Sequence, residues 1–140
     1  MKPRLSKSAI QLREQIDDAF PDRDRKSDGW IGDSRHSKTK SDHNPDAQGW
    51  VRAIDIDADL DKRKETSIYL ADQIRAYGKA NGRVTYVIHM GKIASAKSLW
   101  RWIKYRGVNP HNHHIHISFA KSSDQDSKFF DIPLLGGING

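Results

Sequence analysis

The amino-acid sequence predicts an α+β fold, with a small and mainly antiparallel sheet and two main helices packed on it. One reason is the order of the patterned segments, which runs helix, strand, helix and then several strands. Another is the pattern inside them, since two segments have helical period and others alternate apolar with polar residues. The length of 140 residues suits one domain with its own core. We therefore expect a single domain, 1–140, with its core at about 8–120 and a C-terminal tail, 121–140, docked on the body.

Two helices are expected from the spacing of apolar residues. The first covers residues 8–20, where apolar side chains recur on one helical face and Pro21 ends the pattern. Ser8 followed by Gln11 resembles a capping box at its start. The second covers about residues 61–79 and is followed by an Asn-Gly pair, which is typical of a helix end.

Four segments alternate as strands do. They are residues 51–57, 84–90, 93–95 and 114–119. Asp55 and Asp57 share one face of the first strand, and His114, His116 and Ser118 share one face of the last. Carboxylates and imidazoles on sheet faces predict a metal site in a groove on the sheet.

The composition excludes several classes of protein. The chain has no cysteine, so disulfides and thiolate metal sites are excluded and any metal must be bound by nitrogen and oxygen. No stretch approaches the ~18 apolar residues of a membrane span, and the N-terminus lacks the apolar core of a signal peptide. We expect synthesis in the cytoplasm and no integral membrane contact. The net charge of +6 favours polyanionic partners, of which nucleic acid and an anionic bacterial cell wall are two.

Histidines are strongly clustered near the end of the chain. Four of the seven lie between His111 and His116. A catalytic zinc commonly takes three ligands of the His, Asp, Glu or Cys type and leaves one position open. His43, an Asp of the segment 51–57 and His116 can supply such a set. A solitary histidine is more often a satisfied surface or core group, whereas the three together favour a zinc site.

The residues themselves leave two assignments open. Asp55 and Asp57 lie on the same strand face, so either can be the carboxylate ligand. His114 and His116 also share a face, so one can bind the metal while the other stands beside it as an acid, base or transition-state donor.

The ordered set of motifs resembles the LAS zinc metallopeptidases, and in particular the D-alanyl-D-alanine carboxypeptidase-like peptidases of bacteriophage endolysins. The family pattern is Ser-Arg, then Ser-x-His-x-x-Gly-x-Ala-x-Asp, a strand pair with a Gly turn, a Trp-Arg segment and a closing His-x-x-His-x-His-x-Ser. The similar segments here are residues 34–35, 41–55, 86–93, 100–102 and 111–118. They follow the same order, and together they extend over most of the chain.

The resemblance implies a role for each matched residue. It places Asp55 in the Ala-x-Asp position, so Asp55 is the expected zinc ligand rather than the aspartate two residues later. The other two implied ligands are His43 and His116. Arg35 and Ser41 are the implied substrate-binding residues, since a guanidinium suits a peptide carboxylate.

Two features depart from the family pattern. The segment between the first two ligands is longer than the compact family spacing. Many relatives also carry a Glu or Asp just before the last histidine as general base, whereas residues 101–122 contain no acidic residue. We therefore expect His114 to be the catalytic acid–base group, with His111 as its helper. His113 should point away from the metal.

The resemblance implies a zinc-dependent peptidoglycan hydrolase that cuts a peptide bond in the stem peptide or the cross-link through a zinc-activated water. No wall-binding repeat is visible, so we expect a bare catalytic domain. It should be made in a host cytoplasm and act as a monomer on the bacterial cell wall, with no nucleic-acid partner.

Other interpretations stay open at this point. A catalytically inactive metal-binding or wall-binding module can carry the same ligands without the acidic base. A metal-dependent nuclease is a weaker alternative, because His111-Asn112-His113 only spells the name of the HNH motif, whose residues are spread over a ββα unit. Residues 100–106 interleave aromatic and basic side chains as single-strand binders do, although packing beside a groove is the commoner reason.

Overall fold

The computed structural model describes residues 2–30 and 41–137. A five-stranded sheet has the order β3-β7-β4-β5-β6, and each neighbouring pair of strands is antiparallel. The strands are β3 (Ala53–Asp57), β4 (Val84–His89), β5 (Lys92–Ser95), β6 (Ile103–Lys104) and β7 (His114–Phe119). A small parallel pair, β1 (Arg4–Leu5) and β2 (Trp50–Val51), lies outside this sheet. The predicted α+β class with a mainly antiparallel sheet is confirmed.

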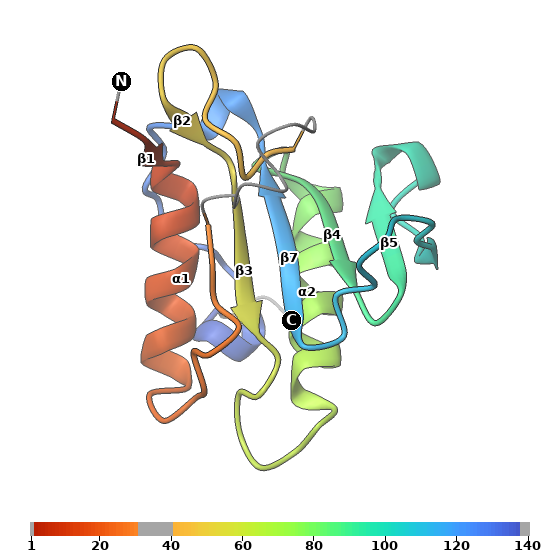
Figure 1. Cartoon of the computed structure of the whole chain (residues 1–140). Helices are drawn as coiled ribbons and strands as arrows, with labels where there is room; N and C mark the ends of the chain where they lie inside the picture. The colour runs from red at the N-terminus through yellow and green to blue at the C-terminus, as the bar shows by residue number, and fades with distance from the viewer. Residues whose placement is uncertain (1, 31–40, 138–140) are drawn as a thin grey trace.

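Two α-helices pack against the sheet, as predicted. They are α1 (Lys7–Ala19) and α2 (Thr66–Ala80), and Figure 1 shows α1 alongside β3 and α2 behind β7 and β4. Three short 3-10 helices complete the elements: η1 (Ala96–Ser98), η2 (Lys121–Ser123) and η3 (Pro133–Leu135). In the described part of the chain, no helix combines the length and the apolar character that crossing a membrane requires.

The start of α1 differs from the sequence prediction. Ser6 stands at the N-cap position, so the expected capping box of Ser8 and Gln11 is wrong. The Ser8 hydroxyl is instead 3.0 Å from the carbonyl oxygen of Ser123 and 2.6 Å from that of Asp126. This serine therefore anchors the segment after β7 on the helix.

The core lies on one face of the sheet because the strands alternate. Ile54 and Ile117, which are partners in the β3–β7 register, are almost fully buried beneath the helices. Leu12 of α1 and Leu70 of α2 are buried in the same cluster. Residues at the intervening strand positions point to the opposite face, which is where the polar side chains gather.

The C-terminal tail is part of this core. Phe130 and Ile132 are fully buried, and Leu135 nearly so. The Gln15 side chain fixes the tail in register, because its amide donates to the Phe130 carbonyl at 2.9 Å and its oxygen accepts from the Phe130 N–H at 2.8 Å.

The predicted strand at residues 51–57 is divided at Arg52. The Arg52 N–H donates to the carbonyl of Asp42 at 3.1 Å and not to a neighbouring strand, while its carbonyl accepts from the Phe119 N–H at 2.8 Å. The Arg52 guanidinium contacts the carboxylates of Asp46 and Asp124, both at 2.7 Å. The interruption therefore holds the loop before β2 close to the beginning of β3.

Candidate metal centre

Asp55 lies in the middle of β3, with backbone pairing on both sides. On one side its N–H donates to the Gly29 carbonyl at 2.8 Å, and the Gly29 N–H donates back at 3.1 Å. On the other side its register partner on β7 is His116. The backbone therefore fixes the direction of the Asp55 side chain, which faces away from the helices.

His43 is presented to Asp55 by a tight turn. The Ser41 hydroxyl accepts a hydrogen bond from the His43 N–H at 3.2 Å, and the Ser41 carbonyl accepts one from Asn44 at 3.0 Å. The His43 Nδ1 lies 2.9 Å from the carbonyl oxygen of Trp30. Because a carbonyl only accepts, Nδ1 carries the hydrogen, and Nε2 is the nitrogen that faces Asp55 Oδ2 at 3.3 Å.

His116 is held in the complementary orientation. Its Nε2 lies 2.8 Å from the Ser118 hydroxyl, and its Nδ1 lies 3.2 Å from Asp55 Oδ1. The ring stacks on Tyr86 with centroids 5.3 Å apart and planes 8° from parallel. Partners of this kind, which orient a histidine through its second nitrogen, are typical of metal-binding histidines.

The ligand atoms of His43, Asp55 and His116 all lie within 4.8 Å of one another, so this group could hold a metal ion. The donor set is two imidazole nitrogens and a carboxylate, which suits zinc and other divalent transition metals. His43 and His116 are buried, and Asp55 is half-buried. Asp55 Oδ1 and His116 Nδ1 are buried without a hydrogen-bond partner. A cation between them fits because it would satisfy both atoms.

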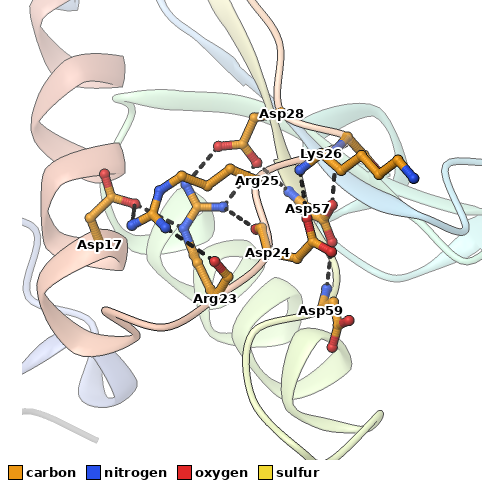
Figure 2. Close-up of polar contacts among 9 residues, drawn as sticks. Asp17, Arg23, Asp24, Arg25, Lys26, Asp28, Asp57 and Asp59 are labelled. Carbon is orange, nitrogen blue, oxygen red and sulfur yellow. Dashed lines mark hydrogen bonds and ion pairs between the residues drawn. The ribbon is translucent and has the colours of Figure 1, made fainter.

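Asp57, the other candidate ligand, is used differently. Its Oδ2 accepts from the Ser27 N–H at 2.9 Å, and its Oδ1 accepts from the Asp59 N–H at 2.8 Å. Figure 2 shows Asp57 within the polar network that also contains Arg23 and Asp28. Burial favours a higher pKa for the Asp57 carboxyl, but the two backbone N–H donors outweigh it and lower the pKa. The geometry therefore brings Asp55, and not Asp57, together with the histidines.

The two predicted catalytic histidines adjoin the same carboxylate. His114 Nε2 is 3.6 Å from Asp55 Oδ1, and the His111 ring lies 4.8 Å from the His114 ring and 5.3 Å from the His116 ring, measured between centroids. The structure therefore gathers His111, His114 and His116 around Asp55. His113 is exposed and lines a different cavity, near Asp57, so it points away from this cluster as expected.

A cavity of about 360 Å³ opens onto the cluster. Its lining includes Ser41 and Tyr86, with Tyr105 and Val108 from the segment before β7. Asp55 is the only acidic residue among the described residues that line it. Burial raises the pKa of Tyr86 to about 12, so its phenol stays protonated and can donate a hydrogen bond.

The side chains of the cluster shift one another's pKa values. Burial favours a higher pKa for Asp55, but the close polar contacts with His116 and His43 outweigh it and hold the pKa well below its usual range. Burial favours a lower pKa for His43, but the neighbouring Asp55 carboxylate outweighs it, so the pKa of His43 is raised. Burial and the neighbouring imidazoles lower the pKa of His111 to about 4 and also lower that of His114. These two rings are therefore neutral at pH 7, with lone pairs available to a proton or a metal.

Two further residues bear on the site, one of them predicted from the sequence and one not. Arg35 lies outside the described residues. His89 was not among the predicted site residues, and its Nδ1 lies 2.9 Å from the His111 carbonyl and 3.0 Å from that of His114. Its Nε2 lies 3.0 Å from the Ser67 hydroxyl on α2. His89 thus ties the histidine segment to the helix, and only its place at the end of a buried strand could have suggested this role.

The chain was also compared with known proteins. Searches against family models, curated proteins and solved structures found no match to it.

Proposed function

We propose that this chain is a zinc-dependent peptidoglycan peptidase, which hydrolyses a peptide bond in the stem peptide or cross-link of the bacterial cell wall. The observation that carries the proposal is the convergence of His43 Nε2, the Asp55 carboxylate and His116 Nδ1 beside an open cavity. Three protein ligands with space for a fourth are typical of a catalytic zinc site, whereas structural sites usually have four protein ligands.

The role of the metal follows from the donor set. A zinc ion held by these residues supplies Lewis acidity, which polarises a scissile carbonyl and makes water a competent nucleophile near neutral pH. The protein's part is to fix the ligands. Trp30 and Ser118 do so by holding the second nitrogens of His43 and His116.

His114 is the group we assign to proton transfer. It is the partly exposed imidazole beside Asp55, and its lowered pKa leaves it neutral and able to accept a proton at pH 7. In the protonated state it can stabilise the developing oxyanion or donate to the leaving amine. His111, whose ring stands edge-on to His114, is the helper. Such a pair replaces the carboxylate base that residues 101–122 lack.

The substrate class is supported by the motif order and by charge. The ordered motifs resemble those of endolysin peptidases, whose substrate is the wall peptide. The net charge of +6 favours an anionic wall polymer. Ser41 lines the cavity, which supports its assignment to substrate binding, and Arg35 is the expected partner of a peptide carboxylate.

The test is digestion of purified peptidoglycan, with and without a metal chelator, read by mass spectrometry of the soluble fragments. The expected result is chelator-sensitive release of fragments with new amino and carboxyl termini, whose masses identify the bond. His116→Ala should abolish release, and His113→Ala, which changes an exposed histidine outside the cluster, should not. Intact peptidoglycan after treatment with zinc-loaded protein would overturn the proposal and favour an inactive wall-binding module.

A further inference from the structure

A second group of ligand atoms lies next to the first. One ligand atom from each of Asp55, His111 and His114 lies within 4.8 Å of the others, as in the first group. The two groups share Asp55 and differ in their histidines. Asp55 Oδ2 faces His43, while Oδ1 faces His114 and His116.

The side-chain atoms of this second group lack partners. In the described part of the chain, five buried side-chain nitrogen or oxygen atoms have no hydrogen-bond partner. Two of them, His111 Nδ1 and His114 Nε2, belong to this group alone, and a third, Asp55 Oδ1, is shared with the first group. Leaving a buried polar atom unsatisfied costs about 1–3 kcal/mol, so two such imidazole nitrogens beside a shared carboxylate oxygen favour a built site.

The backbone also holds His111 in an unusual conformation. Its φ is +60°, a left-handed conformation that is uncommon outside Gly, although Asn, Asp and His adopt it more often than other residues. The Asn109 side chain accepts from the His111 N–H at 2.9 Å, and the His111 carbonyl accepts from the Met90 N–H at 3.3 Å and from His89. These contacts turn the His111 ring toward His114 rather than toward solvent, and the residue is buried.

We propose that Asp55, His111 and His114 form a second zinc position that shares the Asp55 carboxylate with the first and fills only at excess metal. Binding there should be weaker for two reasons. Two zinc ions repel each other strongly at short range in a partly buried site. The negative charge of the Asp55 carboxylate is also already partly neutralised by the first ion.

The second position has a functional consequence, and this consequence alone rests on the proposed function. A metal bound to His114 occupies the lone pair that proton transfer needs. Zinc should therefore activate the enzyme at one equivalent and inhibit it at higher concentration.

The experiment is a calorimetric titration of the metal-free full chain with Zn²⁺, repeated with Co²⁺, whose absorption spectrum reports its ligands. The wild-type protein should bind two equivalents, the second at least tenfold more weakly. His114→Ala and His111→Asn should each bind one. Asparagine is chosen because it tolerates the left-handed backbone at this position. The matched control His113→Ala should bind two, and circular dichroism should show that every variant is folded.

The outcomes separate the two proposals. A single equivalent in the wild-type chain, or a second equivalent that persists in either variant, overturns the second position. Peptidoglycan digestion is then followed across the same zinc range. Two equivalents without digestion at any zinc concentration support the second position and reject the peptidase, whereas digestion with only one bound equivalent does the reverse.

Discussion

Asp55 and His116 lie directly opposite each other on β3 and β7, and Asp55 Oδ1 is 3.2 Å from His116 Nδ1. The backbone ladder of the sheet therefore fixes two of the three ligands, and only His43 depends on a loop. A register slip of one residue would send a whole strand's side chains to the opposite face. Sheet pairing thus sets the geometry of the candidate metal centre.

The contrast between Asp55 and Asp57 gives the first prediction. Asp55→Ala should lower zinc affinity at least ~100-fold, because it removes the carboxylate ligand. Asp57→Ala should leave zinc affinity nearly unchanged and lower the free energy of unfolding by about 3 kcal/mol, since two backbone N–H groups lose a charged acceptor. Competition with a coloured chelator and urea denaturation measure the two quantities. Equal loss of zinc in both variants would contradict the assignment.

The Ser118 hydroxyl should tune the metal site without binding the metal. Ser118→Ala removes the partner of His116 Nε2 and should weaken zinc binding about 10- to 100-fold. Activity should return when zinc is added in excess of the new Kd and below the second position's range. Ser122→Ala, an exposed serine on the following segment, is the control and should match the wild type. Unchanged affinity in the Ser118 variant would remove this residue from the site.

Metal removal should destabilise the fold. Zinc that binds only the folded state stabilises it by about 4 kcal/mol when free zinc is 1,000-fold above Kd. At roughly 2–4 °C per kcal/mol for a domain near this size, the chelated protein should melt about 10 °C lower. Scanning calorimetry with and without chelator measures the shift. In His116→Ala the shift should be clearly smaller, because only the weaker second position remains, and a shift as large as in the wild type would show that zinc stabilises the protein elsewhere.

The metal-free protein should lose stability in mild acid. Burial and neighbouring imidazoles lower the pKa of His111 to about 4, and the pKa values of His114 and His89 are also lowered, mainly by burial. Unfolded histidines have a pKa near 6.5. Between about pH 4 and 6.5 the unfolded chain binds more protons, so stability falls as pH falls. His43 acts in the opposite direction because its pKa is raised in the folded protein. Its contribution to folding stability is fully present below pH 6.5 and is lost as the pH rises through its folded-state pKa.

The corresponding measurement is the melting temperature in chelator at several pH values from 4.5 to 7.5. It should rise with pH up to about 6.5. His111→Asn should flatten this slope, because it removes the histidine whose pKa is lowered to about 4. A slope that is unchanged in the variant would mean that His111 does not carry the effect.

Arg52 should matter more than an exposed arginine. Its guanidinium contacts Asp46 and Asp124 at 2.7 Å with only 14% of the side chain exposed. Arg52→Met should lower the free energy of unfolding by about 2–3 kcal/mol, because it leaves two carboxylates without their partner. Arg25→Met, at a side chain 48% exposed and 3.3 Å from Asp17, should cost less than about 1 kcal/mol. Urea denaturation compares them, and equal losses would contradict the argument.

Much of the fold was predictable because its signals are local. The period of apolar residues located both α-helices and the alternation located β4, β5 and β7, to within a few residues. Three features were missed because they depend on distant contacts. The break at Arg52 follows from its bonds to Asp42 and Asp124. The Ser8 hydroxyl bonds to the segment after β7 and does not cap its own helix. The strand β6 forms only because it pairs with β5.

For the site, the sequence by itself determined the kinds of ligand and the strand faces that carry them. Residue identity and a period of two are sufficient to put Asp55, Asp57, His114 and His116 on strand faces. Only the tertiary structure decided which carboxylate joins the histidines. In the loop at residues 23–28, the Ser27 N–H donates to the Asp57 carboxylate, while strand pairing places Asp55 opposite His116. These contacts join residues about 30 to 60 positions apart, and no local pattern encodes which distant backbone a side chain will meet.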